Sequence, residues 1–228
     1  MEFKSLESVT DRSGYNVILY GESGFGKTYS ISTLPDFSRA VIIAAEPGLK
    51  TLRDNDMPEG ISQIRTLVAT TYDEFDLAAR LIRDNISTID TVVIDSLSKV
   101  SERILTTERE RTTDARHLYP EMEGQVMRLL NRMLDLECNL ICICKQGMAN
   151  VAGFDKNAAS FPGRQLPKNL PYEFDYVFAL RQREEPDGTL TRCFQTQPCP
   201  VYHAKTRGNK LDQYETPNWK NIFNKLNN

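Results

Sequence analysis

One stretch of the sequence has the residue types and the spacing of a phosphate-binding loop. It follows the pattern G-x-x-x-x-G-K-T and consists of Gly21, Glu22, Ser23, Gly24, Phe25, Gly26, Lys27 and Thr28. The glycines let the backbone curl so that successive N–H groups point at phosphate oxygens. In such a loop the lysine reaches the β- and γ-phosphates, and the hydroxyl of the next residue ligates Mg²⁺. The stretch therefore predicts a site for a nucleoside triphosphate and Mg²⁺.

Two carboxylates close apolar runs and are candidates to complete this site. Asp95 ends the run TVVID, and we expect it to hold Mg²⁺ together with Thr28. The alternative is that Asp95 only caps the next helix. Glu46 follows the run AVIIAA at residues 40–45, where a carboxylate can polarise the attacking water. The alternative for Glu46 is a solvated turn residue.

A second motif, NKLD at residues 209–212, matches the N-K-x-D signature of guanine-specific GTPases. Those proteins also carry D-x-x-G after the second carboxylate strand, whereas Asp95 is followed by Ser-Leu-Ser, and no apolar strand leads directly into Asn209. We therefore treat the match as coincidence and expect ATP to be the nucleotide.

The elements that position these residues follow from the apolar pattern. Short runs rich in Val and Ile, without polar alternation, predict strands buried on both faces. We expect strands at 15–20, 40–45, 91–95, 138–144, 175–181, 191–197 and 201–205. Helical spacing predicts helices after a capping box at Thr71 and over 121–136, and the phosphate loop should lead into a further helix. The alternation predicts one α/β domain over residues 1–228, with a mostly parallel central sheet flanked by helices and antiparallel strands near the C-terminus.

The composition limits the class of protein and the cellular compartment that we expect. The chain has 228 residues with 40% hydrophobic and 26% charged residues, which excludes a disordered chain. Its aliphatic runs reach only strand length, its first residues lack an apolar signal core, and its five cysteines fit a reducing compartment. We therefore expect a cytoplasmic protein without a membrane partner. The net charge is −3, but residues 145–228 are basic, which leaves room for an anion-binding face.

Taken together, these motifs resemble the RecA-like P-loop ATPases, and most closely the compact phage branch related to Sak-type single-strand annealing proteins. The resemblance runs from Tyr15 to about Leu211. It implies that Glu46 activates the water, that Asp95 belongs to the metal-binding strand, and that Gln146 senses the γ-phosphate.

The resemblance also implies that Lys205 and Arg207 reach into the nucleotide site of a neighbouring subunit. Two residues apart on the expected strand, they would point to the same side and could neutralise charge on the transferred phosphoryl group. The alternative is an ordinary exposed basic strand edge.

Residues 147–170 show no clear periodicity and predict a long loop. The segment combines cations with aromatic rings, which suits single-stranded nucleic acid because cations track phosphates while rings stack on bases. In RecA-like proteins a DNA-binding loop follows the sensing Gln, and the candidates here are Lys156, Arg164, Lys168, Phe154 and Phe161. The alternative is a mobile surface loop.

The sequence thus predicts a Mg²⁺-dependent ATPase, stimulated by single-stranded DNA, that assembles head-to-tail as a ring or filament. The resemblance implies strand annealing or exchange in phage recombination, in a bacterial host cytoplasm, with a single-strand binding protein as a further candidate partner. Two alternatives stay open. One is a P-loop kinase for nucleotides or small molecules, and the other is a nucleotide-switched replication loader with little ATPase activity.

Overall fold

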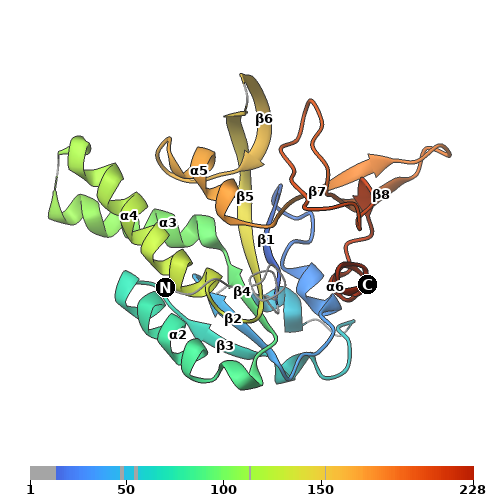
Figure 1. Ribbon diagram of the computed structural model, residues 1–228, viewed down its shortest axis with the longest axis horizontal. Helices are drawn as coiled ribbons and strands as arrows, with labels where there is room; N and C mark the ends of the chain where they lie inside the picture. Colours follow the sequence, from blue (N-terminus) through green and yellow to red (C-terminus); the bar gives the residue numbers. More distant parts are fainter. Residues whose placement is uncertain (1–13, 47–48, 54–55, 113, 152) are drawn as a thin grey trace, which may run out of the picture.

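The computed structural model of the protein describes residues 14–228 apart from 47–48, 54–55, 113 and 152. Its centre is a mixed sheet whose strands run in the order β3-β2-β4-β5-β1-β7-β8-β9, with β6 paired to β5 (Figure 1). The strands are β1 Asn16–Gly21, β2 Ala40–Ala44, β3 Arg65–Val68, β4 Thr91–Asp95, β5 Asn139–Val151, β6 Phe154–Ala159, β7 Tyr176–Glu184, β8 Leu190–Gln195 and β9 Tyr214–Glu215.

Pairing within the sheet is mostly parallel, as the sequence predicts. β1 lies between β5 and β7 and is parallel to both, while β2 is parallel to β3 and β4. β8 and β9 continue the sheet in antiparallel pairing, and β6 is antiparallel to the outer part of β5. Because β5 also pairs with β4, it separates the strand of the phosphate loop from the strand of Asp95.

Helices cover both faces of the sheet. The α-helices are α2 Tyr72–Asp84, α3 Leu97–Arg111, α4 Ala115–Leu134, α5 Leu166–Glu173 and α6 Trp219–Asn227. Short 3₁₀ helices are η1 Tyr29–Thr33, η2 Leu49–Arg53, η3 Ile61–Gln63 and η4 Ile86–Thr88. Among the described residues, no helix combines the length and the apolar character needed to cross a lipid bilayer.

The hydrophobic core is divided into two layers by the central strands. Ile18 and Tyr20 of β1 belong to the cluster under α2, α3, α4 and α5, whereas Val17 and Leu19 belong to the cluster with η1 and α6. Alternating side chains of a strand point to opposite faces, so both layers draw on the same apolar runs. This is the burial on both faces that the unbroken aliphatic pattern predicts.

Several predicted elements are confirmed in detail. Thr71 and Glu74 form the expected capping box, in which the Thr71 hydroxyl accepts from the Glu74 N–H and the Glu74 carboxylate accepts from the Thr71 N–H. The apolar side chains that helical spacing places on one face over 121–136 are buried, from Met122 to Leu136. The buried Cys142 and Cys144 fill space in β5, and burial raises the pKa of both thiols.

Three expectations about secondary structure are wrong. Residues 201–205 form no strand and make only isolated bridges at Tyr202 and Lys205. β3, β6 and β9 are not among the predicted strands. The phosphate loop leads into the five-residue η1 instead of an α-helix. Serine, threonine and isoleucine are weak helix formers, and Pro35 forces Leu34 into an extended conformation with ψ 147°.

Candidate functional site

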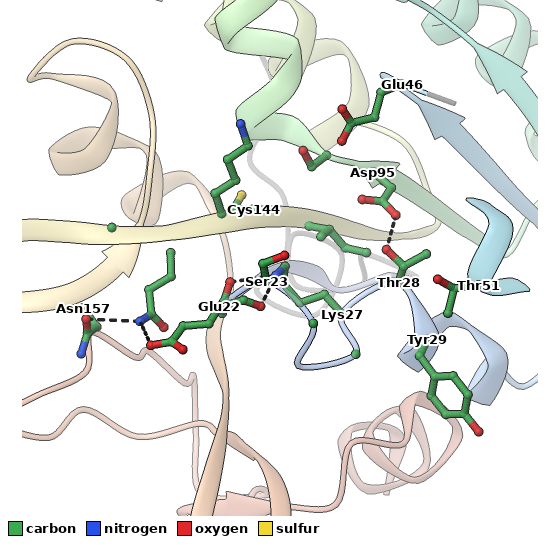
Figure 2. Close-up of a pocket in the computed structure, with 18 of the residues that line it drawn as sticks. Glu22, Ser23, Lys27, Thr28, Tyr29, Glu46, Thr51, Asp95, Cys144 and Asn157 are labelled. Carbon is green, nitrogen blue, oxygen red and sulfur yellow. Dashed lines mark hydrogen bonds between the residues drawn. The ribbon is translucent and has the colours of Figure 1, made fainter. Parts of the chain in front are cut away.

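A pocket of about 910 Å³ opens at the carboxyl ends of the parallel strands (Figure 2). Its walls come from the phosphate loop after β1, the ends of β2 and β4, and the middle of β5. The lining residues are Gly21, Glu22, Ser23, Gly24, Gly26, Lys27, Thr28, Tyr29, Glu46, Thr51, Asp95, Ser96, Ile143, Cys144, Lys145, Gln146, Gly147, Met148 and Asn157. Crevices at this edge are where open α/β sheets bind ligands.

The phosphate loop starts where β1 and β7 approach each other closely. A Cβ on Gly21 would lie 2.5 Å from the carbonyl oxygen of Leu180, so only glycine fits at this point. At the other end of the loop, the Lys27 ammonium donates to the carbonyls of Gly21 and Glu22 at 2.8 and 2.7 Å. Burial lowers the pKa of Lys27, and the nearby Asp95 carboxylate opposes that shift. The ammonium is thus held inside the curl of the loop.

Thr28 and Asp95 meet directly across the pocket. The Thr28 hydroxyl donates to the Asp95 carboxylate at 2.7 Å (Figure 2). Burial raises the pKa of Asp95, while the Thr28 hydrogen bond and the Lys27 charge lower it. Ser96, not Asp95, caps α3 by accepting from the Lys99 N–H. The capping alternative for Asp95 is therefore wrong, and its carboxylate faces the loop.

These two side chains offer the ligand chemistry that Mg²⁺ requires. A hydroxyl and a carboxylate are hard oxygen ligands, which Mg²⁺ prefers when it also bridges to phosphates. The carboxylate is partly buried and bonded to a neutral donor, so its charge is incompletely balanced. The residues present therefore fit a magnesium ion, which Thr28 and Asp95 would hold.

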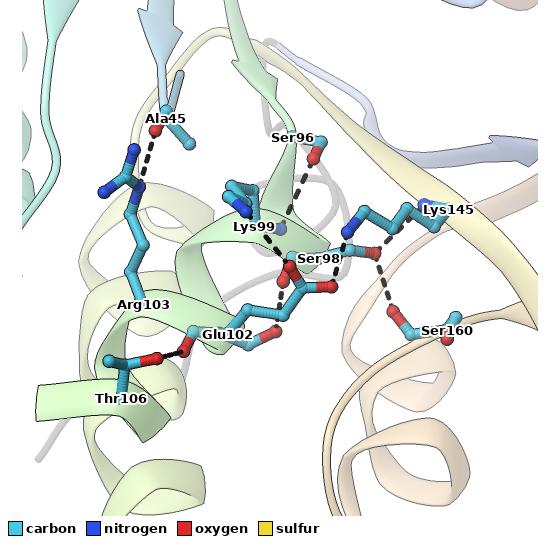
Figure 3. A network of polar contacts seen from close by, with 10 residues as sticks. Ala45, Ser96, Ser98, Lys99, Glu102, Arg103, Thr106, Lys145 and Ser160 are labelled. Atoms are coloured by element: carbon cyan, nitrogen blue, oxygen red, sulfur yellow. Dashed lines mark hydrogen bonds and ion pairs between the residues drawn. The ribbon is translucent and has the colours of Figure 1, made fainter. Parts of the chain in front are cut away.

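Glu46 extends from the end of β2 into the same pocket. Its side chain is exposed, and its charge contributes to the raised pKa of Asp95. The strand end beneath it is fixed because the Arg103 Nε donates to the Ala45 carbonyl at 2.7 Å (Figure 3). A carboxylate so placed can accept a proton from a water molecule in the pocket.

Gln146 lies beside the phosphate loop because β5 is the neighbour of β1. Its amide donates to the Glu22 carboxylate at 3.3 Å and to the Asn157 side-chain oxygen at 3.4 Å. Gln146 therefore connects the loop on one side with β6 on the other. Sequence reasoning missed Asn157, Thr51 and Lys145 as pocket residues; only Lys145, next to Gln146, had a signal that could have found it.

Residues 13–208 match a family described as the AAA domain. The chain belongs to the AAA-domain family. This AAA domain is accordingly a P-loop ATPase, a class that binds nucleotides, usually with Mg²⁺. A search of curated proteins found no match.

Solved structures show the same fold. The AAA domain resembles an ATPase from the type III secretion system of pathogenic bacteria, described as prototypical, with a TM-score of 0.52 and 14% identity. The likeness covers 74% of this chain and 52% of the secretion ATPase, so the AAA domain spans about half of that protein's length. At this identity the likeness is one of fold.

Most of the segment predicted as a DNA-binding loop is regular secondary structure in the AAA domain. The described residues of 147–170 form the outer half of β5, all of β6, an irregular connection at 160–165 and the start of α5. β5 pairs with β6 from Gln146 to Val151. We call residues 146–159 the β5–β6 hairpin. The expectation of a long irregular loop was wrong because residues 146–159 carry no regular alternation of polar and apolar side chains.

The five candidate DNA-binding residues have different surroundings. Phe154 is 68% exposed, and two cations are also exposed, Arg164 just before α5 and Lys168 in its first turn. Lys156 donates to the Cys199 carbonyl at 2.9 Å and is held within the chain. Phe161 is 8% exposed and packs in the core, so its ring cannot stack on a base. The prediction for Phe161 is wrong.

The expected basic pair is not presented as predicted. The Lys205 ammonium donates to the carbonyls of Pro171 and Phe174 at 2.9 and 2.6 Å, near the end of α5. The Arg207 guanidinium pairs with Asp175 at 3.2 Å and is 62% exposed. Because residues 201–205 form no strand, the geometric reason for placing both cations on one side is wrong.

The N-K-x-D match has a structural explanation. Lys210 donates to the Leu226 carbonyl at 2.6 Å, and Asp212 pairs with Lys225 at 2.8 Å. Leu211 is buried in the core layer that includes α6. The motif therefore fastens α6 to the AAA domain and does not line the pocket.

Proposed function

We propose that this AAA domain hydrolyses ATP and uses the nucleotide to control the binding of single-stranded DNA by the β5–β6 hairpin. The observation that carries the proposal is the continuity of β5. The strand lines the nucleotide pocket at Gln146 and continues without a break into the hairpin, which extends beyond the sheet (Figure 1). A change at the pocket thus has a direct structural route to an exposed surface.

The pocket residues suit phosphoryl transfer to water. Lys27 would bind the β- and γ-phosphates, and Thr28 and Asp95 would hold Mg²⁺, which when bound neutralises charge on those phosphates. Glu46 would orient the attacking water and accept its proton. Gln146 would exchange its hydrogen bond to Glu22 for one to the γ-phosphate. These roles agree with the distances around Lys27, Thr28 and Asp95.

A network of polar contacts joins the magnesium strand to the hairpin (Figure 3). Ser98, in the first turn of α3, donates to the Ser160 carbonyl at 2.6 Å and accepts from the Lys145 N–H at 3.0 Å. Lys145 also pairs with Glu102 at 2.5 Å. Because α3 begins next to Asp95, these contacts would transmit a movement of that strand end to the base of the β5–β6 hairpin.

The hairpin carries groups that suit a single strand. Phe154 and Met148 are 68% and 67% exposed, which is unusual for large apolar side chains. Arg164 and Lys168 are exposed on the segment that follows the hairpin. A ring can stack on a base while the cations contact phosphates. The resemblance to Sak-type proteins then favours annealing or strand exchange in phage recombination as the task.

A second function, a nucleotide-switched loader, is favoured by one observation. Within the hairpin itself, Asp155 and Lys156 balance each other, so the exposed Met148 and Phe154 stand on a surface without net charge. Such a surface also suits docking onto a protein. In that case the AAA domain would bind ATP, hydrolyse it slowly, and bind a replication protein.

The two functions are separated by the affinity for a labelled oligonucleotide in the presence of a non-hydrolysable ATP analogue. Phe154→Ala should weaken binding roughly tenfold, because stacking of one base contributes about 1–3 kcal/mol. The matched control is Tyr172→Ala, an aromatic residue that is 77% exposed on α5. Arg164→Ala with Lys168→Ala should flatten the salt dependence, since each lost phosphate contact reduces the slope by about 0.7.

Unchanged affinity in the Phe154→Ala protein, or no binding by the wild type, would reject the DNA proposal and favour the loader. Turnover that rises with a nucleoside monophosphate but not with single-stranded DNA would favour a kinase.

We also propose head-to-tail assembly, with Arg207 as the residue that enters a neighbour's site. Arg207 pairs with Asp175, which accepts from the Asn16 N–H at the beginning of β1, whereas the phosphate loop follows the end of that strand. A cation there is far from its own pocket and accessible to a second copy. Mixing Arg207→Ala with Lys27→Ala protein should restore turnover, and mixtures that stay inactive at every ratio would reject it.

A further inference from the structure

The guanidinium of Arg192, on β8, lies against the phosphate loop. Its Nη1 atom is 3.3 Å from the point that a Cβ on Gly26 would occupy. Gly26 has φ +96° and lines the nucleotide pocket. The missing side chain at Gly26 therefore leaves space on the loop that the end of Arg192 reaches.

The sheet register explains how a residue so distant in sequence arrives there. β7 pairs with β1 up to Gly21 and then continues beyond it, carrying β8 along as its antiparallel partner. Arg192 is opposite Gln182, two residues past the Leu180 that faces Gly21. It shares a face of β8 with Phe194, whose ring packs against Trp219 in the core layer that includes η1.

β7 and β8 together form the β7–β8 hairpin, residues 176–195. Arg192 differs from the other arginines of the β7–β8 hairpin in having no partner. Among the residues that the structure describes, it is exposed and makes no hydrogen bond or ion pair. Arg181 donates to the Gln195 side chain at 2.8 Å and lies over the Tyr202 ring. Arg183 pairs with Glu185 at 3.1 Å and lies over the Tyr214 ring. Those two arginines are occupied on the opposite face of the hairpin.

The charge of the pocket indicates what a free guanidinium would bind. Carboxylates outnumber lysines among the lining residues, which include Glu22, Glu46, Asp95, Lys27 and Lys145. The Lys145 ammonium is already paired with Glu102. Lys27 and a bound Mg²⁺ would neutralise part of the charge of a polyphosphate in this pocket, and a guanidinium would add further positive charge in a bidentate geometry that matches phosphate oxygens.

We propose that Arg192 binds phosphate oxygens of the nucleoside di- or triphosphate, from the side of the loop opposite to Gln146. Arg192 is then a nucleotide-binding residue supplied by the same chain. The inference deepens the nucleotide site of the proposed ATPase and rests on it. It also makes the β7–β8 hairpin a second element that contacts the nucleotide, beside the β5–β6 hairpin.

The test is calorimetric titration of the full chain with ATP, ADP and ITP. Arg192→Ala should weaken ATP and ADP binding roughly ten- to a hundredfold, the range for losing hydrogen bonds to a charged group. Arg192→Lys should recover part of the loss because it keeps the charge but not the bidentate geometry. Arg183→Ala, which removes an arginine from the other face of the same hairpin, should bind within about twofold of wild type. The ratio of ATP to ITP affinity should not change, since ITP differs only in the base.

Wild-type affinity in the Arg192→Ala protein would overturn the inference, and so would an altered ATP to ITP ratio, which would place Arg192 on the base. An equal loss in Arg183→Ala would also overturn it, because the effect would then come from the hairpin's stability. The Lys27→Ala protein distinguishes a wrong inference about Arg192 from a wrong assignment of the nucleotide site. If wild type and Lys27→Ala bind ATP equally, the nucleotide site itself is wrong.

Discussion

The replacement Ser98→Ala tests the connection between the nucleotide pocket and the β5–β6 hairpin. Ser98 is 1% exposed, and its hydroxyl is the only atom removed. It bridges two backbone groups outside its own helix, the Ser160 carbonyl at 2.6 Å and the Lys145 N–H at 3.0 Å. The change therefore removes a contact on each side of the hairpin's base without creating a large cavity.

The expected cost follows from those two bonds. A hydrogen bond contributes about 0.5–1.5 kcal/mol net, and a buried group left without a partner costs about 1–3 kcal/mol. We therefore expect Ser98→Ala to lower the free energy of unfolding by about 2–3 kcal/mol. Ser101 provides the control, since it is also fully buried in α3 but donates only to the Ser98 carbonyl, at 2.8 Å. Such a local bond contributes little, so Ser101→Ala should be nearly neutral.

Urea unfolding of the two variants measures the difference, and helix propensity cancels because both changes are Ser to Ala. Hydrogen exchange at the Lys145 amide should become faster in Ser98→Ala alone. In the same protein ATP should still bind, but the ATP analogue should no longer change the affinity for DNA. If the two variants unfold within about 0.5 kcal/mol of each other, the bridge has no energetic weight and the coupling route is wrong.

Three further predictions concern the pocket. Because burial raises the pKa of Asp95, its stabilising contribution is present below the ordinary carboxylate range and is lost as pH rises through the raised pKa. In ligand-free urea unfolding, Asp95→Asn should therefore gain stability relative to wild type as pH rises from about 4 to 8, and a constant difference would contradict this. The single tryptophan, Trp219, donates from its Nε1 to the Ser30 hydroxyl at 3.1 Å, just after the phosphate loop, so its fluorescence should change with ATP in wild type but not in Lys27→Ala. Glu46→Gln should bind ATP normally and lose turnover by roughly 10²–10⁴-fold, whereas unchanged turnover would remove Glu46 from the reaction.

Much of the fold and the centre of the site could be predicted from local patterns. The aliphatic runs predict the parallel strands other than β3, because burial on both faces leaves an unbroken signal. β3, at the edge of the sheet, is largely exposed and carries no such signal. The motif at 21–28 and the strand-ending Asp95 predict the meeting of Thr28 with Asp95, since parallel strands bring their carboxyl ends to one edge.

The remaining features depend on pairings that local patterns do not show. The run at 201–205 is apolar enough for a strand, but it forms only isolated bridges, one of them from Lys205 to Val177. Phe161 is an aromatic among loop-forming residues, yet tertiary packing buries it. The approach of Arg192 to Gly26 depends on how far β7 extends past β1, which no single segment encodes.

The central claim is that one pocket hydrolyses ATP and responds to DNA bound at the β5–β6 hairpin. The most direct measurement is the steady-state rate of ATP hydrolysis with and without single-stranded DNA, for wild type and for Lys27→Ala as the blank. We predict turnover in wild type that rises when DNA is added, and none in Lys27→Ala under either condition. Equal rates in the two proteins, or a wild-type rate that DNA leaves unchanged, would contradict the account.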